Sequence, residues 1–333
     1  MEFTEVISEF KDSLAKVEKA IKVNYRSDVP LIPGMTGHLM NGGGKRIRPL
    51  LLMLCAQLGG RAVDEEVANH GCVVEYIHAA TLLHDDVVDE TTVRRGQETV
   101  NSKWGSDASI LVGDYLLSRA ILLLAENNNA KIIQAVAGAA KILVEGGIKE
   151  YSHARKITVS EEHCLDVIYR KTSSIITASC EVGMLLAGGN ETQIKAVVDF
   201  GNHFGMAFQL MDDALDYDGD KSILGKPPGT DFKEGHVTLP LLHLYNNGSG
   251  RLRSEIKGFI KNENVTAQDF EYILEQMRRT RSIEYTQELA RDYMSKAQAA
   301  LKTTEFPAPR YVEHLLSTAT YIVERHLPAK SCS

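Results

Sequence analysis

The sequence predicts an all-α fold, and three observations lead to that prediction. Apolar residues recur with the 3.6-residue period of a helix from one end of the 333-residue chain to the other. Runs of alternating β-branched residues bounded by tight hairpin turns are hard to find. The composition, 44% hydrophobic and 24% charged, is that of an ordinary globular protein with a large core. Since no repeat and no biased linker interrupts the chain, we expect a single helical domain over residues 1–333.

Capping residues mark three of the expected helix starts. Asn190 and Gln193 are spaced as in a capping box, ahead of an apolar helical stripe. Ser160 precedes two glutamates, and Thr266 lies three residues before Asp269. Each pattern satisfies backbone N–H groups that have no partner within the first helical turn. We therefore expect helices to begin directly after Ser160, Asn190 and Thr266.

Charge and cysteine content limit the classes of function. The 44 acidic residues outnumber the 37 basic residues, and this net charge of −7 argues against the broad basic surface that binds nucleic acid. The five cysteines show no C-x-x-C spacing and indicate reduced thiols. The N-terminus lacks the basic and then apolar pattern of a secretory signal. We expect a cytoplasmic protein with no nucleic-acid partner.

The most apolar window is shorter than a membrane span. It runs from Ile110 to Ala125, which is 16 residues, and it includes Asp114 and Arg119. A membrane-spanning helix needs about 20 apolar residues. We expect a buried helix here and no transmembrane segment.

Two helical stretches each place a pair of carboxylates on one face. Residues 75–89 read EYIHAATLLHDDVVD, in which Asp85 and Asp89 are four residues apart and so point the same way. Residues 205–216 read GMAFQLMDDALD and repeat the arrangement with Asp212 and Asp216. One such motif alone is more often a solvated acidic face. Two copies, each at the end of an apolar stripe, favour a metal site.

Magnesium is the cation that these motifs predict. Carboxylates at this spacing repel one another unless cations neutralise them. Oxygen ligands with no cysteine nearby favour Mg²⁺, which keeps several waters and bridges protein carboxylates to substrate phosphates. The motifs therefore predict a magnesium-dependent site for a phosphate-bearing substrate.

Cationic residues gather in four places that suit a phosphate. Residues 42–49, GGGKRIRP, put three glycines before Lys45, Arg46 and Arg48, so that the backbone can approach an anion and the cations can donate to it. Alone, this segment is as typical of an ordinary loop with a basic helix start. The other places are Arg94-Arg95, Lys171-Thr172 and the loop 224–231 with Lys226. With the apolar stripes, they predict a ligand that carries both phosphate and a hydrocarbon tail.

Five motifs together resemble those of the trans-type polyprenyl diphosphate synthases. They are, in chain order, GGGKRIRP, DDVVDETTVRRG, Lys171-Thr172, FQLMDDALD and GKPPGTDFKEGHVTLP. The resemblance covers residues 40–245, and residues 246–333 fit as C-terminal packing helices. It implies a helical bundle around a deep central cavity, with the aspartate motifs facing each other at its mouth, and a homodimer. It also implies a prenyltransferase that condenses isopentenyl diphosphate head-to-tail onto an allylic diphosphate.

The resemblance also assigns roles to individual residues. Magnesium would be bound by Asp85, Asp89, Asp212 and Asp216, with Asp213 and Asp231 as outer or additional metal contacts. The allylic diphosphate would be held by Arg94, Lys171 and Lys226, with Thr172 and Gln209 lining the reacting end. Isopentenyl diphosphate would be held by Lys45, Arg48, His78 and Arg95. One position departs from the family: His236 stands where a lysine is usual, so a fixed positive charge is lost there.

The residues before the first motif indicate the length of the product. Thr81 and Ala80, the fourth and fifth residues before Asp85, are small, whereas short-chain members of the resembled family tend to place a bulky aromatic there. The stripe continues through Ile77 and Val74 without an aromatic barrier, over roughly 16 Å of helix. We expect a long product, octaprenyl diphosphate, with the tunnel floor supplied by another helix such as the one containing Leu116 and Ile121.

Other functions explain fewer of these features. A short-chain farnesyl or geranylgeranyl diphosphate synthase is the alternative within the resembled family. A metal-dependent helical phosphohydrolase, binding metal through His70, His78 and His84, leaves the second aspartate motif and GGGKRIRP unexplained. A regulatory subunit of a heteromeric prenyl synthase usually has degraded aspartate motifs, and this chain keeps both.

Overall fold

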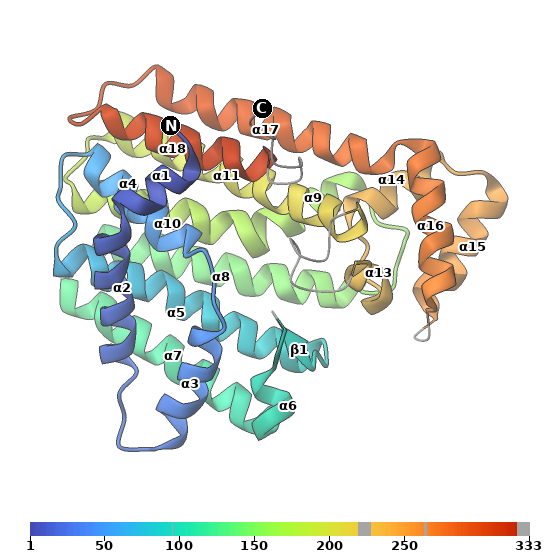
Figure 1. The fold of residues 1–333 in the computed structure, drawn as a ribbon, viewed down its shortest axis with the longest axis horizontal. Helices are drawn as coiled ribbons and strands as arrows, with labels where there is room; N and C mark the ends of the chain where they lie inside the picture. The colour runs from blue at the N-terminus through green and yellow to red at the C-terminus, as the bar shows by residue number, and fades with distance from the viewer. Residues whose placement is uncertain (95, 219–227, 263–264, 325–333) are drawn as a thin grey trace, which may run out of the picture. The chain divides into compact units, whose positions relative to one another are not determined.

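The computed structural model describes residues 1–94, 96–218, 228–262 and 265–324, and these are almost entirely helical (Figure 1). The first eight helices are α1 (Phe3–Glu9), α2 (Lys11–Asn24), α3 (Leu31–Asn41), α4 (Ile47–Leu58), α5 (Glu65–Val88), α6 (Val100–Trp104), α7 (Ser106–Asn127) and α8 (Ala130–His153). They are followed by α9 (Glu161–Ile168), the π-helical turn η1 (Tyr169–Ser173), α10 (Ser174–Leu186), α11 (Glu191–Asp218), α13 (Thr230–Glu234) and α14 (Leu239–Asn247). The last four are α15 (Gly250–Lys261), α16 (Ala267–Thr280), α17 (Ser282–Lys302) and α18 (Arg310–Glu324). The predicted all-α class is confirmed.

A small hairpin is the only sheet among the described residues. β1 (Val93–Arg94) pairs antiparallel with β2 (Gln97–Glu98), so that Val93 lies opposite Glu98 and Arg94 opposite Gln97. Strands of two residues leave no alternating apolar pattern, which is why the sequence did not predict them. The hairpin positions Arg94 just beyond the end of α5.

The three predicted helix starts are confirmed by their capping contacts. The side chains of Asn190 and Gln193 each accept a hydrogen bond at 3.0 Å from the other's backbone N–H. Ser160 accepts from the N–H of His163 at 3.1 Å. Thr266 and Asp269 form the reciprocal capping box at the start of α16. Local polar patterns therefore predicted these boundaries correctly.

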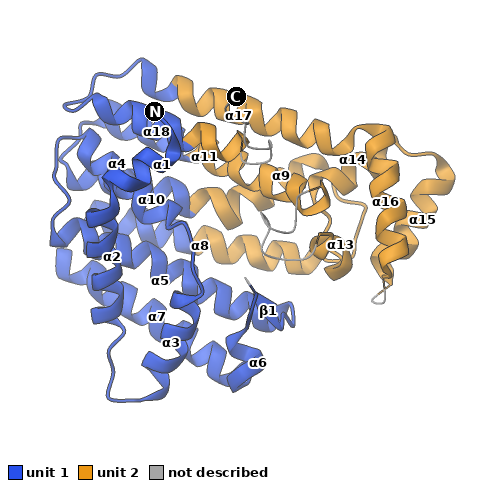
Figure 2. Ribbon diagram, in the orientation of Figure 1, with its two compact units in different colours: residues 1–140, 175–201, 300–318 blue, residues 141–174, 202–299, 319–333 orange. Residues whose placement is uncertain are grey.

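The chain divides into two compact units (Figure 2). Unit 1 comprises residues 1–140, 175–201 and 300–318, and unit 2 comprises residues 141–174, 202–299 and 319–333. The first aspartate motif and GGGKRIRP belong to unit 1. The second aspartate motif, Lys171 and His236 belong to unit 2. The single domain over residues 1–333 stays a prediction.

Helix α5 is the central element of unit 1. It packs most extensively against α7, and also against α4 and α2. The Tyr76 hydroxyl donates a 2.7 Å hydrogen bond to the carbonyl of Ile21 in α2, which satisfies a polar atom inside the core. Buried apolar side chains along α5 include Val67, Val73, Val74, Ile77, Ala80 and Leu83. This packing fixes the helix whose C-terminal end carries the first aspartate motif.

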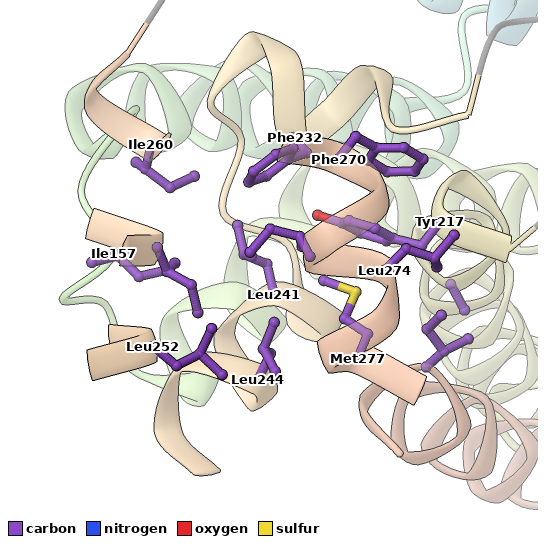
Figure 3. Close-up of a cluster of buried hydrophobic side chains, with 14 residues drawn as sticks. Ile157, Tyr217, Phe232, Leu241, Leu244, Leu252, Ile260, Phe270, Leu274 and Met277 are labelled. Atoms are coloured by element: carbon purple, nitrogen blue, oxygen red, sulfur yellow. The ribbon is translucent and has the colours of Figure 1, made fainter. Parts of the chain in front are cut away.

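A cluster of buried apolar side chains lies at the end of α11 in unit 2 (Figure 3). Tyr217, next to Asp216, stacks on Phe270 of α16 with ring centroids 6.2 Å apart. Gly229 has a left-handed backbone (φ +73°), and a Cβ on it would come within 2.2 Å of the Phe270 ring. Only glycine fits both this backbone and this close approach. The cluster therefore holds the end of α11 that carries the second aspartate motif.

Helix α7 differs from its prediction in length and in orientation. It has 22 residues rather than 16, and by length and composition alone it could cross a membrane, with 39% of its most apolar window buried. Core helices of water-soluble proteins pass the same test. Leu116 is fully buried, but the side chain of Ile121 is 66% exposed. The helix predicted to be buried is therefore covered on one face, and the helical period does not show which face of an apolar helix is covered.

Candidate active site

The first aspartate motif ends α5 in unit 1. Asp89 is the C-cap residue, and its backbone N–H donates to the carbonyl of Asp85 at 2.8 Å. The residues Asp85 and Asp89 are both partly exposed and lie one helical turn apart, as predicted. Asp86, between them, is buried. The motif therefore presents two accessible carboxylates and one enclosed carboxylate.

Arg94 contacts the enclosed carboxylate of this motif. Its Nε and Nη2 atoms lie 2.8 Å and 2.7 Å from Oδ1 of Asp86. The Asn101 side chain donates a 2.9 Å hydrogen bond to the carbonyl of the same aspartate. A guanidinium carries five N–H donors in a fixed fork. A guanidinium that is already bound to a carboxylate can therefore still donate to an anion. The structure thus brings Arg94 to the first motif, while Arg95 lies outside the described residues.

The basic motif leads into α4, which packs against α5. Arg46 has a left-handed backbone (φ +48°) directly before the first residue of α4. Lys45 is exposed and Arg48 is half-buried, whereas the Arg46 guanidinium donates to Glu75 of α5. His78 lies one helical turn beyond Glu75. The predicted residues Lys45, Arg48 and His78 therefore stand on two elements that are held together by contacts of the motif itself.

The second aspartate motif lies near the end of α11 in unit 2. Asp212 is partly exposed, whereas Asp213 and Asp216 are buried. The Asp216 carboxylate accepts a 3.1 Å hydrogen bond from the backbone N–H of Asp231, which lies in the first turn of α13 after Gly229. The structure thus brings Asp231 to this motif, and its role as a metal contact stays a prediction.

A chain of hydrogen bonds joins this motif to η1. The Thr172 hydroxyl donates to Oε1 of Gln209 at 2.7 Å, and Nε2 of Gln209 donates to Asp213 at 2.8 Å. Burial and the nearby Asp231 raise the pKa of Asp213 well above the usual carboxyl value, although the bond from Gln209 opposes this. Unit 2 therefore holds closely spaced acids whose charge is costly unless a cation neutralises it.

Lys171 projects from a π-helical turn. Such wider turns often occur at functional sites. The Nζ atom of Lys171 is ion-paired with Glu150 of α8. The neighbouring turn lies close against α8, because a Cβ on Gly146 would come within 2.6 Å of the Arg170 Cβ. The position of Lys171 is therefore set by α8 as well as by its own turn.

A cavity of about 160 Å³ in unit 2 gathers several of these residues. The predicted residues that line it are Lys171, Thr172 and Gln209, together with His236 and Asp213. The other lining residues are Glu150, His153, Ala154, Val159, His163, Cys164, Val167, Ile168, Val237, Thr238 and Leu239. Lys226 lies outside the described residues. The mixture of cations, acids and apolar side chains suits a ligand with a charged head.

His236 faces carboxylates in this cavity. Its Nδ1 atom lies 3.8 Å from Glu150, and its Nε2 atom lies 3.5 Å from Glu234. Glu150 therefore contacts both Lys171 and the imidazole that replaces the usual lysine. No local pattern marked Glu150, because 21 residues separate it from Lys171 and no helical period spans that distance.

The cavity also contains a pair of histidines that the sequence did not link. The rings of His153 and His163 lie 4.3 Å apart. Burial and the neighbouring His153 lower the pKa of His163, and burial raises the pKa of the Cys164 thiol to about 12. Cys164 is thus a protonated thiol near neutral pH and no nucleophile.

The carboxylates present fit a hard divalent cation. Among the described residues no three His, Cys, Asp or Glu side chains are already gathered around a metal position. Mg²⁺ is commonly bound by one or two carboxylates, waters and substrate phosphates rather than by a complete protein cage. Burial and the nearby Asp231 raise the pKa of Asp213, so a cation bound beside it would stabilise its ionised form. In each unit, partly exposed carboxylates, Asp85 and Asp89 in unit 1 and Asp212 in unit 2, are of the oxygen-ligand type that such an ion prefers.

Comparison with known proteins decides the family. A family model described as Polyprenyl synthetase matches residues 29–277. The octaprenyl diphosphate synthase of Haemophilus influenzae is 37% identical over 313 residues, which are 94% of each chain. The chain belongs to the polyprenyl synthetase family. It is therefore a trans-prenyltransferase of isoprenoid biosynthesis.

Members of this family with other products are also similar. The heptaprenyl diphosphate synthase component 2 of Bacillus subtilis is 31% identical over 98% of this chain and 91% of its own. A crystal structure of a polyprenyl synthase from Caulobacter crescentus, complexed with calcium and isoprenyl diphosphate, has a TM-score of 0.92 and 36% identity, and 98% of each chain is covered. The synthases from Haemophilus influenzae and Bacillus subtilis thus share the family but differ in product length, since one is named for an octaprenyl and the other for a heptaprenyl product.

The residues expected to set product length lie along α5. Val74, Ile77 and Ala80 are buried, and Thr81 is partly exposed. The Thr81 hydroxyl donates back to the carbonyl of His78 at 2.9 Å, as is common for threonine within a helix. No aromatic side chain stands at these four positions, and that they leave room for a growing chain beneath the first motif stays a prediction.

The histidines of the phosphohydrolase alternative have other partners. His70 is buried and hydrogen bonded through Nδ1 to the carbonyl of Glu66 at 2.8 Å. His84 lies 3.2 Å from the carbonyl of Ile110 and 3.5 Å from Asp114 of α7. The family membership removes this alternative.

Proposed function

We propose that this trans-prenyltransferase is a magnesium-dependent long-chain polyprenyl diphosphate synthase that makes octaprenyl diphosphate. It would extend an allylic diphosphate by successive additions of isopentenyl diphosphate. The observation that carries the proposal is the connected set Lys171, Thr172, Gln209 and Asp213, which joins a cation and a buried acid around one cavity of unit 2. A diphosphate that carries magnesium needs a cationic side chain to contact its oxygens and a carboxylate to bind the metal.

In this proposal the two aspartate motifs and the cations divide the work. Asp85, Asp89, Asp212 and Asp216 would hold magnesium, which supplies neutralising charge to the departing diphosphate. Lys171 would break its ion pair with Glu150 and bind the allylic diphosphate. Arg94 would be held in position by its ion pair with Asp86. Lys226 would add a further cation, and Thr172 with Gln209 would line the reacting end.

Isopentenyl diphosphate would be held in unit 1 by Lys45, Arg48, His78 and Arg95. The allylic C–O bond breaks, the double bond of isopentenyl diphosphate forms the new C–C bond, and one proton is lost as diphosphate leaves. Apolar surroundings must exclude water from the allylic cation, since water would quench it to an alcohol. The buried stripe of α5 supplies such surroundings.

The proposed product length rests on the small residues of α5. Ala80 and Thr81 leave room where an aromatic would stop the growing tail, and Ile77 and Val74 continue an apolar wall. Leu116 of α7 is buried in the same unit and is the better candidate for a floor residue now that Ile121 faces outward. The similarity to an octaprenyl diphosphate synthase supports this length.

We also propose that the protein is a homodimer in the cytoplasm. Exposed apolar side chains recur at helical spacing on α7, at Ile110, Leu111, Ile121 and Leu122. An exposed apolar helix face of this kind is typical of a surface that another protein chain covers. Light scattering should give the mass of a dimer, and Leu111→Asp should give a monomer. Val29→Asp, at another exposed apolar side chain of unit 1, is the matched control. A wild-type monomer that floats with lipid vesicles would assign the face to a membrane instead.

Incorporation of labelled isopentenyl diphosphate tests the function. The purified protein, Mg²⁺ and an allylic primer should yield labelled product that organic solvent extracts, and omitting the primer or chelating the metal should stop it. Arg48→Ala should raise the KM for isopentenyl diphosphate about 10-fold, since a charge-assisted contact is lost, and should change the KM for the primer much less. Equal increases in both KM values would show that Arg48 is assigned to the wrong substrate.

A further inference from the structure

Arg46, the middle cation of GGGKRIRP, has a backbone that its residue type disfavours. Its φ and ψ are +48° and +38°, in the left-handed region. Side chains other than those of glycine, asparagine and aspartate adopt this region rarely, and such residues persist where the surrounding structure fixes them. Lys45 precedes Arg46 and Arg48 follows it by two residues. The conformation of Arg46 therefore decides the directions in which both neighbours leave the chain.

All three nitrogens of the Arg46 guanidinium donate to acceptors within unit 1. Nε lies 2.6 Å from Oε1 of Glu18 in α2, and Nη1 lies 2.7 Å from Oε2 of Glu75 in α5. Nη2 donates to the carbonyl of Met40, near the end of α3, at 3.0 Å. The Arg46 side chain is 13% exposed. It is thus turned into the protein, unlike the exposed Lys45.

The charges of this contact are matched. The Glu75 side chain is 5% exposed and that of Glu18 is 38% exposed. Burial lowers the pKa of Arg46, but the two carboxylates outweigh it, so that its pKa lies above the ordinary value. Removing Arg46 would leave the Glu75 charge buried without this partner, and removing Glu75 would leave Arg46 with Glu18 as its carboxylate partner among these contacts.

We propose that Arg46 and Glu75 are positioning residues of the isopentenyl diphosphate site rather than ligands of a phosphate. The pair joins the loop that carries Lys45 and Arg48 to α5, on which His78 lies one turn after Glu75. The pair thereby fixes the distance between the Lys45 and Arg48 side chains on the loop and the His78 side chain on α5, which together would hold one diphosphate. This inference rests on the proposed function, because it assigns Lys45, Arg48 and His78 to that substrate.

Steady-state kinetics of Arg46→Lys and Glu75→Gln test the inference. Lysine keeps the charge but cannot make the forked contact. Each variant should raise the KM for isopentenyl diphosphate about 10-fold, the lower end of the loss typical when a residue that orients a ligand is changed. The KM for the allylic primer and kcat at saturating substrate should change less than about 3-fold. Glu18→Gln is the matched control, since it removes the more exposed partner of the same arginine, and it should leave both KM values near wild type.

The double variant Arg46→Gln/Glu75→Gln separates positioning from stability. It removes both buried charges, so its Tm should recover relative to either single glutamine variant. Its KM for isopentenyl diphosphate should nevertheless stay high, because two neutral side chains do not restore the forked contact. A KM that returns to normal with Tm, or equal increases in both KM values, would overturn the inference. A wild-type protein that incorporates no isopentenyl diphosphate would instead overturn the proposed function.

Discussion

The two aspartate motifs have the same spacing but different surroundings. In unit 1 the central acid, Asp86, is paired with Arg94. In unit 2 the central acid, Asp213, accepts from the neutral Gln209 amide and lies near Asp231, which with burial raises its pKa. The central acid of the first motif thus contacts a cation, whereas the central acid of the second accepts from a neutral amide. The central acid of the second motif should therefore gain more from an added cation.

The apolar stripes before the motifs differ as well. Four and five residues before Asp85 stand Thr81 and Ala80, which are small. Four residues before Asp212 stands Phe208, whose ring stacks on that of Phe204 with centroids 6.3 Å apart. In the proposed function, a growing hydrocarbon tail would meet small side chains on α5 and a bulky one on α11. Product length should accordingly respond to the residues of α5.

The largest effect should come from removing a metal-binding carboxylate of either motif. Asp85→Ala and Asp212→Ala should each lower kcat by about 100-fold or more, the loss typical for one electrostatic contact to the transition state. Turnover at saturating Mg²⁺ and substrates is the measurement. Near-normal turnover in either variant would show that its motif is not part of a shared metal site.

The central acids should respond in opposite ways to loss of their charge. Asp86→Asn breaks the ion pair with Arg94 and should lower the free energy of unfolding by about 2 kcal/mol. Asp213→Asn relieves crowded negative charge and should preserve or increase the stability of the metal-free protein at neutral pH. Urea unfolding in the presence of a chelator measures both. Equal destabilisation by the two substitutions would contradict the contrast between the motifs.

The pH dependence of stability should reveal the raised pKa of Asp213. A carboxyl whose pKa is higher in the folded state contributes stability below its unfolded value of about 3.9, and that contribution is lost as the pH rises through the folded pKa. The metal-free wild type should therefore lose stability relative to Asp213→Asn as the pH increases. Urea midpoints of both proteins from about pH 5 to 8 test this. Parallel curves would mean that Asp213 is already ionised across this range.

The smallest effect on rate, with a clear effect on product, should come from Thr81→Phe. An aromatic at this position should stop the tail and shift the product towards farnesyl or geranylgeranyl diphosphate, while the condensation step continues. Ala80→Phe should act in the same direction. Val29→Phe is a suitable control, because that side chain is exposed and lies outside α5 and α7. A folded, active Thr81→Phe enzyme with an unchanged long product would contradict the role of α5.

Patterns within one helix predicted much of the fold and part of the site. The helical period placed Asp85 with Asp89 and Asp212 with Asp216, and side-chain capping placed the starts of α9, α11 and α16. Contacts between distant segments could not be predicted, since no local period encodes them. Glu150 meets Lys171 across 21 residues, and Arg46 meets Glu75 across 29 residues from a left-handed backbone. The outward face of Ile121 likewise depends on which neighbour covers α7.

The central claim is that this protein makes a long-chain polyprenyl diphosphate. Its most direct test is the size of the product that the wild-type enzyme forms from labelled isopentenyl diphosphate, farnesyl diphosphate and Mg²⁺, measured by chromatography after removal of the phosphates. The account predicts octaprenol as the main product and none when the metal is chelated. Two results would contradict it. One is a shorter primer that is extended only to farnesyl or geranylgeranyl diphosphate, and the other is no elongation of any primer.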